Sequence, residues 1–281
     1  MRRDESPFLL FPGAGSIGQA VTAVSDFYTA ITEVAVHGRW DVDLSASAVE
    51  VLRKCFADQP SGLIVDLHDL SDPQGASAPL WSTARSWGER RRPPVPVVVC
   101  LPSAAPLAAV LRRRGARWFL PIYATVPEAR AALIASAAHP ERLTIHLAPD
   151  PDALAEVPAV IDYACASWNL PELVQPATAV LAELVANAID HARSRIDVAV
   201  SRRRAGLHLT VHDRSPDIPP APRYVAGDPG DPARQGLGLG LVHSLADAWG
   251  ALPTRTGKLV WATVSTPPAT GKTATAEPSI E

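Results

Sequence analysis

The sequence predicts an α/β fold built from two units and a short C-terminal tail. Apolar residues make up 47% of the 281 residues and charged residues 20%, so the chain can bury a substantial core. Runs rich in β-branched residues alternate with helix-forming stretches at a spacing typical of sheets covered by helices. His139-Pro140 interrupts this alternation near the middle of the chain. The predicted division is an N-terminal extension 1–28, a first unit 29–139, a second unit 141–265 and a disordered tail 266–281.

The elements of the first unit follow from the order of these runs. Its strands are predicted at residues 34–38, 62–67 and 95–100, and its helices at 46–57, 78–89, 105–113 and 127–138.

The second unit is predicted to mix hairpin-connected strands with longer helices. Its strands are expected at 143–147, 195–201, 207–213 and 259–265, and its helices at 151–167, 171–192 and 239–249. Residues 215–235 are rich in proline, which predicts a long irregular loop, and loops of that length are usually functional.

Charge and hydropathy exclude two classes of partner. The formal net charge is −3, and neither half is basic enough to follow a phosphate backbone, so no direct nucleic-acid binding is expected. No apolar run approaches the ~18 residues of a membrane helix. We therefore expect a soluble, cytoplasmic protein without membrane contact.

Two glycine motifs do not fit their usual nucleotide-binding context. Residues 13–18 spell G-x-G-x-x-G, but the acid expected after the next strand is missing, because Glu33 precedes its strand. The segment is interpreted as a glycine turn whose role stays open. Gly271-Lys272-Thr273 lacks the strand and helix that flank a phosphate-binding loop.

The informative helix covers residues 178–192. Its apolar residues form one stripe at helical spacing, namely Val180, Leu181, Leu184, Val185, Ala188 and Ile189. Glu183, Asn187 and Asp190 are four and three residues apart and share another face. Such a face is commonly only a solvated one, so its interpretation depends on the segments that follow.

Two later segments carry complementary chemistry. One predicted strand ends at Asp213, and Gly236, Gly238 and Gly240 open the next helix. Glycines at a helix start leave N–H groups free for phosphates, and a carboxamide oxygen is a hard ligand for Mg²⁺. A carboxylate one turn from it can accept a proton, and a lone buried carboxylate can accept a hydrogen bond from an adenine amine. Together these groups favour nucleotide binding.

At these residues the chain resembles the GHKL ATPase superfamily, and within it the anti-sigma-factor serine kinases. Glu183-x-x-x-Asn187-x-x-x-His191-Ala192 is similar to the family's N box, Asp213-x-Ser215 to its first glycine box with serine in place of glycine, and Arg234-x-Gly236-x-Gly238 to the second. The resemblance implies ATP and Mg²⁺ as cofactors, with Glu183 as general base and Asn187 as metal ligand. The residues it places at the nucleotide are Asn187, Asp190, His191, Asp213, Ser215, Arg234, Gly236, Gly238 and Gly240.

The first unit resembles, more weakly, a STAS domain, the fold of the anti-anti-sigma partners of such kinases. The similarity rests on residues 36–41, 63–67 and 124–129. The switch loop departs from the family, because Ala76 occupies the position at which STAS domains carry the serine that is phosphorylated. A register shift of one residue would bring Ser77 there instead.

The resemblances imply an ATP-binding regulatory protein of a bacterial partner-switching system, acting as a serine/threonine kinase. The alternative is a non-catalytic protein that sequesters a partner, and a histidine-type sensor kinase is disfavoured because no dimerisation helix pair is visible. The expected partner is a STAS-domain anti-anti-sigma protein, a sigma factor, or both. The oligomeric state stays open, a homodimer included.

Overall fold

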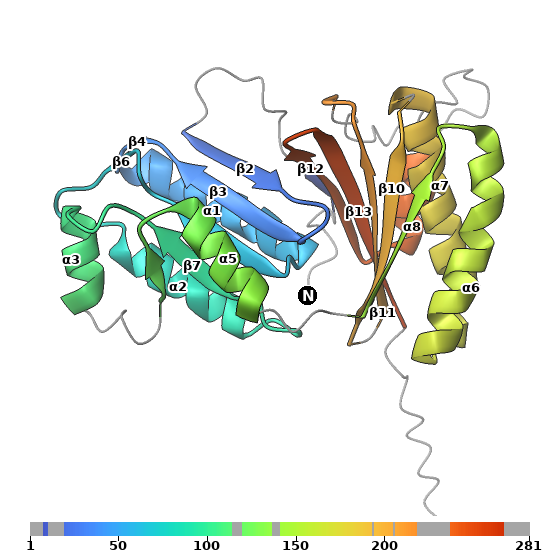
Figure 1. Ribbon diagram of the computed structural model, residues 1–281, viewed down its shortest axis with the longest axis horizontal. Coiled ribbons are helices and arrows are strands. Elements are labelled where there is room, and N and C mark those ends of the chain that lie inside the picture. The colour runs from blue at the N-terminus through green and yellow to red at the C-terminus, as the bar shows by residue number, and fades with distance from the viewer. Residues whose placement is uncertain are drawn as a thin grey trace, which may run out of the picture.

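The computed structural model describes residues 8–10, 20–113, 120–136, 141–192, 194–204, 206–217 and 237–266. Within this part of the chain, helices cover two main sheets, of five and six strands, and the predicted α/β class is confirmed (Figure 1). The glycine motif at 13–18, most of the predicted loop 215–235 and the tail beyond Thr266 lie outside the described residues. No helix in the described ranges has both the length and the apolarity to cross a bilayer.

The N-terminal unit is a mostly parallel sheet with helices on both faces. Its strand order is β2-β3-β5-β7-β8, with only the β2–β3 pair antiparallel. These strands are β2 (Val21–Ser25), β3 (Ile31–Val36), β5 (Gly62–Asp66), β7 (Val97–Cys100) and β8 (Ile122–Tyr123). Both faces of the central strands are covered, which explains their continuous apolar sequences.

Helices α1 (Val42–Asp58), α2 (Ala78–Glu89) and α3 (Pro106–Arg113) share one core cluster with the sheet, and α5 (Val126–Ser136) packs on the opposite face. The start of α1 precedes the prediction by four residues, because the Asp41 carboxylate accepts a hydrogen bond from the Leu44 N–H at 2.8 Å and caps the helix. The short strands β4 (Gly38–Arg39) and β6 (Leu70–Ser71) pair in parallel beside the main sheet.

The C-terminal unit is a six-stranded sheet with helices on one face. Its order is β1-β12-β13-β11-β10-β9, and only the β1–β12 pair is parallel. These strands are β1 (Phe8–Leu10), β9 (Arg142–Leu147), β10 (Ile196–Arg203), β11 (Gly206–Asp213), β12 (Ala248–Thr254) and β13 (Gly257–Ser265). The helical layer holds η1 (Pro151–Glu156), α6 (Val157–Trp168), η2 (Pro171–Leu173), α7 (Val174–Ala192) and α8 (Leu237–Leu245).

The other face of the six-stranded sheet packs against the N-terminal unit. Leu259 and Trp261 of β13 belong to the same buried cluster as Phe27 and Phe56 of the N-terminal unit. Polar contacts also join the units, since the Arg142 guanidinium donates to the Phe27 carbonyl oxygen at 2.6 Å. The sheet is therefore buried on both faces, by its own helices on one side and by the N-terminal unit on the other (Figure 1).

The predicted helix 239–249 is wrong in its second half. Helix α8 ends at Leu245, and β12 begins at Ala248. Trp249 pairs with Ala262 in the β12–β13 hairpin and is fully buried. The apolar residues in this segment are compatible with either a helix or a strand, and the pairing with β13 determines that the segment from Ala248 onward is a strand.

Candidate functional site

Helix α7 carries the polar face that the sequence singled out. The predicted stripe is buried in the core, with Ile189 partly buried beside it. Glu183 and Asn187 are half-buried, whereas Asp190 and His191 are exposed. The helical periodicity thus places Glu183 and Asn187 at the boundary between the core and the solvent, whereas Asp190 and His191 lie on the solvent-exposed side of the helix.

The Asn187 side chain has an unsatisfied buried atom. Its amide nitrogen Nδ2 is buried and has no hydrogen-bond partner among the residues that the structure describes. An orphaned amide of this kind costs about 1–3 kcal/mol, so the residue fits a position completed by a ligand.

Asp213 closes β11 and is fully buried. Its Oδ1 atom accepts from the Ser215 N–H at 2.8 Å and from the Lys258 ammonium at 3.0 Å. Its other oxygen, Oδ2, is buried, and no described residue is hydrogen-bonded to it. Asp213 therefore has one oxygen in the protein network and a second available to a ligand.

Lys258 is the residue that sequence reasoning missed. It lies opposite Asp213 in the β11–β13 register, and 1% of its side chain is exposed. The signal was a charged residue within an otherwise apolar strand, next to Leu259. Its meaning depended on the register, which the sequence alone does not provide.

The remaining predicted residues that the structure describes are Ser215, just after β11, and the glycines at the start of α8. Ser215 is half-buried, and its hydroxyl accepts from the Asp217 N–H at 3.3 Å. Gly238 and Gly240 lie in the first turn of α8, and a Cβ added at Gly240 would meet nothing within 4 Å. Arg234 and Gly236 lie outside the described residues.

This arrangement offers a helix start with accessible backbone, a carboxamide and a carboxylate. The first N–H groups of α8 have no partner within the helix and favour an anion. No group of three or more His, Cys, Asp or Glu side chains suited to a metal occurs in the described ranges. Mg²⁺ usually keeps several waters and is shared with phosphates, so a single carboxamide such as Asn187 fits this ion.

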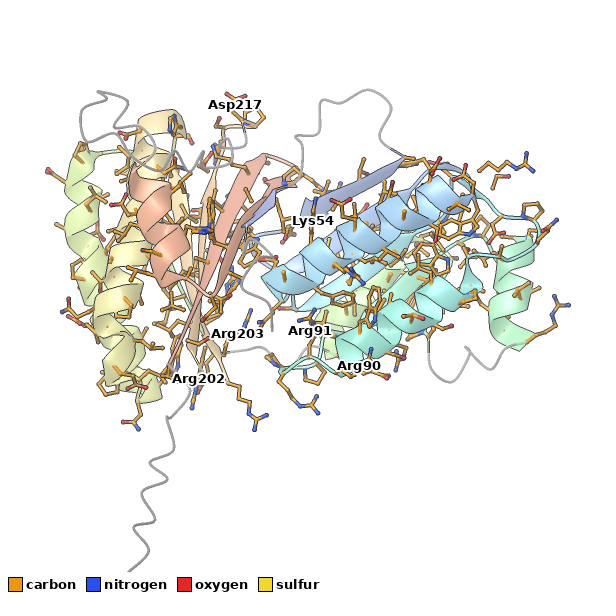
Figure 2. All side chains as sticks on the ribbon, turned by 180° about the vertical axis from the view of Figure 1, so that it is seen from behind. Lys54, Arg90, Arg91, Arg202, Arg203 and Asp217 are labelled. Carbon is orange, nitrogen blue, oxygen red and sulfur yellow. The ribbon has the colours of Figure 1, made fainter. Side chains whose placement is uncertain are left out.

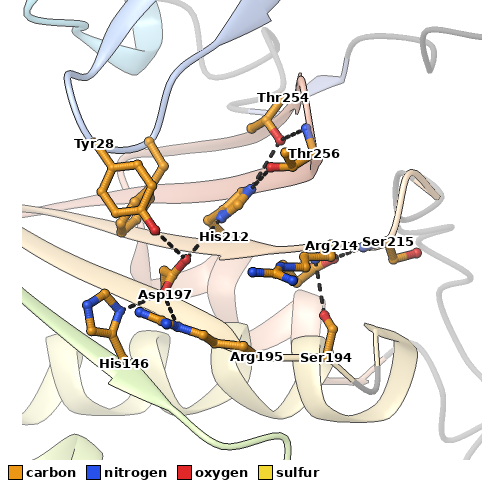
Figure 3. Close-up of polar contacts among 12 residues, drawn as sticks. Tyr28, His146, Ser194, Arg195, Asp197, His212, Arg214, Ser215, Thr254 and Thr256 are labelled. Carbon is orange, nitrogen blue, oxygen red and sulfur yellow. Dashed lines mark hydrogen bonds and ion pairs between the residues drawn. The ribbon is translucent and has the colours of Figure 1, made fainter.

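A second polar network lies on the opposite face of the sheet, between the units. Asp197 accepts hydrogen bonds from Tyr28, His146, Arg195 and His212 (Figure 3). Burial acts to raise the pKa of the Asp197 carboxyl, but the hydrogen bonds from His146, His212 and Arg195 outweigh it and hold the pKa below its ordinary value. The network joins Tyr28 of the N-terminal unit to three strands of the C-terminal sheet.

Replacing Asp197 with Asn is expected to lower the free energy of unfolding by about 1–3 kcal/mol near pH 7. Because the pKa of this carboxyl is lowered on folding, its contribution is complete above about pH 4 and is lost as the pH falls through the lowered value. In urea denaturation, the difference between wild type and variant should therefore shrink below pH 4. Asp162→Asn on the exposed face of α6 is the control, and a difference that stays constant down to pH 3 would contradict the role of the charge.

Three comparisons with known proteins were made. No curated protein matches the chain. Among solved structures, the crystal structure of an anti-sigma factor antagonist from Mycobacterium paratuberculosis is similar at 20% identity, covering 42% of this chain and 97% of that one with a TM-score of 0.33. Residues 147–264, which contain α7, Asp213, α8 and Lys258, match the family model described as the histidine kinase-like ATPase domain.

Proposed function

We propose that the chain is an ATP-binding regulatory protein that transfers the γ-phosphoryl group of ATP to a serine or threonine of a separate STAS-domain protein. The observation that carries the proposal is a pair of buried atoms, Asn187 Nδ2 and Asp213 Oδ2, that have no hydrogen-bond partner among the described residues and lie in the segment that matches the ATPase family. Buried polar groups are rarely left unsatisfied unless a ligand, ion or water completes them.

Each residue has a role that its environment supports. The Asp213 carboxylate would accept a hydrogen bond from the adenine amine, and the N–H groups at the start of α8 would bind phosphate oxygens. The carboxamide oxygen of Asn187 would hold Mg²⁺, which when bound neutralises charge on the transferred phosphoryl group, and the Nδ2 group would donate to the ligand. Glu183, one turn before Asn187, would accept the proton of the attacking hydroxyl.

The relation between the two units favours a separate acceptor protein. The proposed site lies on the helical side of the C-terminal sheet, and the N-terminal unit covers the other side (Figure 1). Arg90 and Arg91, which follow α2, lie at the end of that helix nearer to the C-terminal unit (Figure 2). Ala76 precedes the other end of α2, a helix of 12 residues and therefore about 18 Å long.

A second candidate is sequestration of a partner without catalysis. It is favoured by Ala76, which is exposed before α2 and carries no hydroxyl. In this case ATP binding would order the C-terminal site, and the N-terminal unit would serve as a docking surface.

Incubating the full-length protein with γ-labelled ATP, Mg²⁺ and a set of STAS-domain proteins separates these candidates. The proposal predicts label on a serine or threonine of one of those proteins. ATP binding without transfer to any of them would favour sequestration, and the absence of ATP binding would contradict both.

The protein's own Ser77 is expected to remain unphosphorylated. Its side chain is fully buried; its hydroxyl donates to Asp72 Oδ2 at 2.6 Å and accepts from the Trp81 indole N–H at 2.9 Å. A phosphoryl acceptor must present its hydroxyl in line with the γ-phosphate, which this position prevents.

Mass spectrometry of the protein held with Mg-ATP tests this expectation. The Ala76→Ser variant, which introduces an exposed hydroxyl beside Ser77, is the matched comparison. Stoichiometric phosphate on Ser77 of the wild type would show that the loop opens and that the register of the STAS-like alignment is shifted.

A further inference from the structure

Lys258 and Asp213 form a buried ion pair that is only partly satisfied. The lysine ammonium has three donors, and the structure assigns one of them to Asp213 Oδ1 at 3.0 Å. In the part of the chain that the structure describes, Asp213 Oδ2 has no hydrogen-bond partner. A buried pair is stable only if its remaining donors and acceptors are also satisfied. The free positions of this pair are therefore an acceptor on one side and donors on the other.

The pair lies on the side of the sheet that faces the helical layer. Side chains alternate along a strand, and Val211 of β11 and Val260 of β13 belong to the same core cluster as α7. Asp213 and Lys258 each lie two residues from one of these valines, on the same side of the sheet. The other side of β13 carries Leu259 and Trp261 against the N-terminal unit.

Gly257 brings Lys258 close to the end of β11. A Cβ at this glycine would be 2.0 Å from the carbonyl oxygen of Asp213, so only glycine allows the two strands to approach so closely here. The position of the ammonium beside the carboxylate is thus set by the backbone as well as by charge.

We infer that Lys258 is a specificity-determining residue that reads the base of the nucleotide, an inference that rests on the proposed ATP binding. Asp213 Oδ2 accepts a hydrogen bond from the N6 amine of adenine, and the Lys258 ammonium donates a hydrogen bond to the neighbouring ring nitrogen N1. Proteins that bind a base in a pocket commonly recognise it by hydrogen bonds to its Watson–Crick edge, which carries N1 and N6 in adenine.

The charge balance of the pair suits a neutral base. A carboxylate alone would leave an uncompensated buried charge beside the base, and Lys258 neutralises it. In 6-oxopurines such as guanine the donor and the acceptor at these two positions are exchanged. The pair would therefore have to rearrange to bind GTP, so ATP is expected to bind more tightly.

Nucleotide analogues test the inference on the unaltered, full-length protein. In 1-deaza-ATP a C–H group replaces N1 and removes only the acceptor for Lys258. We expect calorimetry to show affinity about 10- to 100-fold weaker for this analogue than for ATP, which is the usual contribution of a hydrogen bond from a charged group. The control is 7-deaza-ATP, which loses a nitrogen on another edge and should bind like ATP.

Lys258→Met provides the second arm, with Lys54→Met in α1 as the matched control. The Lys258 variant should bind ATP as weakly as the wild type binds 1-deaza-ATP and should no longer distinguish the two nucleotides. Equal binding of ATP and 1-deaza-ATP by the wild type, or binding of GTP at least as tight as that of ATP, would overturn the inference and leave ATP binding intact. If ATP itself is not bound, the proposed function fails instead. If Lys258→Met does not fold, the comparison of ATP with 1-deaza-ATP on the wild-type protein still tests the inference.

Discussion

Replacing Glu183 with Gln is expected to slow turnover of ATP by about 10²- to 10⁴-fold, which is the usual contribution of a positioned general base. Glutamine keeps the size of the side chain and its half-buried place on α7 but cannot accept the proton of the attacking hydroxyl. ATP affinity should stay close to that of the wild type, because the base acts in the transition state. Single-turnover hydrolysis of labelled ATP, in which water replaces the acceptor hydroxyl as the nucleophile, measures the rate, and calorimetry measures the affinity.

Asp190→Asn is the matched control for Glu183→Gln. Asp190 lies nearly two turns further along α7 and is exposed, so its replacement should leave the rate unchanged. The opposite pattern, with an active Glu183 variant and a slow Asp190 variant, would transfer the role of base to Asp190.

Local periodicity predicted the elements whose burial follows from their own sequence. The helix expected at residues 78–89 is α2 within the same bounds, and the apolar stripe of α7 is buried as expected. Strand β2 and strand β12 were missed. Each is defined by its pairing with β3 or β13, and the choice of a pairing partner is not encoded in a short window.

The arrangement of the two units depends on similarly non-local contacts. Trp261 and Leu259 alternate with Val260 and Ala262, so β13 is apolar on both faces. The sequence therefore indicates that both faces are covered. That the second cover is the N-terminal unit follows from contacts such as that between Arg142 and the Phe27 carbonyl oxygen, which are 115 residues apart.

For the candidate site, the sequence predicted the residues but not the state of their atoms. Spacing on a helix was enough to group Glu183 with Asn187, and the end of a strand was enough to single out Asp213. The unpartnered oxygen of Asp213 and its pairing with Lys258 depend on the β11–β13 register. A one-residue shift of that register would have turned Lys258 to the other face.

Replacing Asn187 with Ala is expected to abolish most Mg²⁺-dependent ATP binding while leaving the free protein at least as stable as the wild type. Loss of a residue that only supports a metal ligand costs about 10- to 100-fold in affinity, and loss of the ligand itself should cost at least as much. The free protein should not be destabilised, because the variant removes a buried amide nitrogen that has no partner.

Thermal denaturation with and without Mg-ATP measures both effects at once. At 100 times its dissociation constant, a ligand stabilises the folded state by about 2.7 kcal/mol, and this increase should disappear in Asn187→Ala. Asn169→Ala is the matched control: Asn169 ends α6 in the left-handed conformation at φ 55°, where alanine is strained. That variant should be less stable without nucleotide yet still gain stability from Mg-ATP. An Asn187 variant that gains as much as the wild type would remove Asn187 from the metal site.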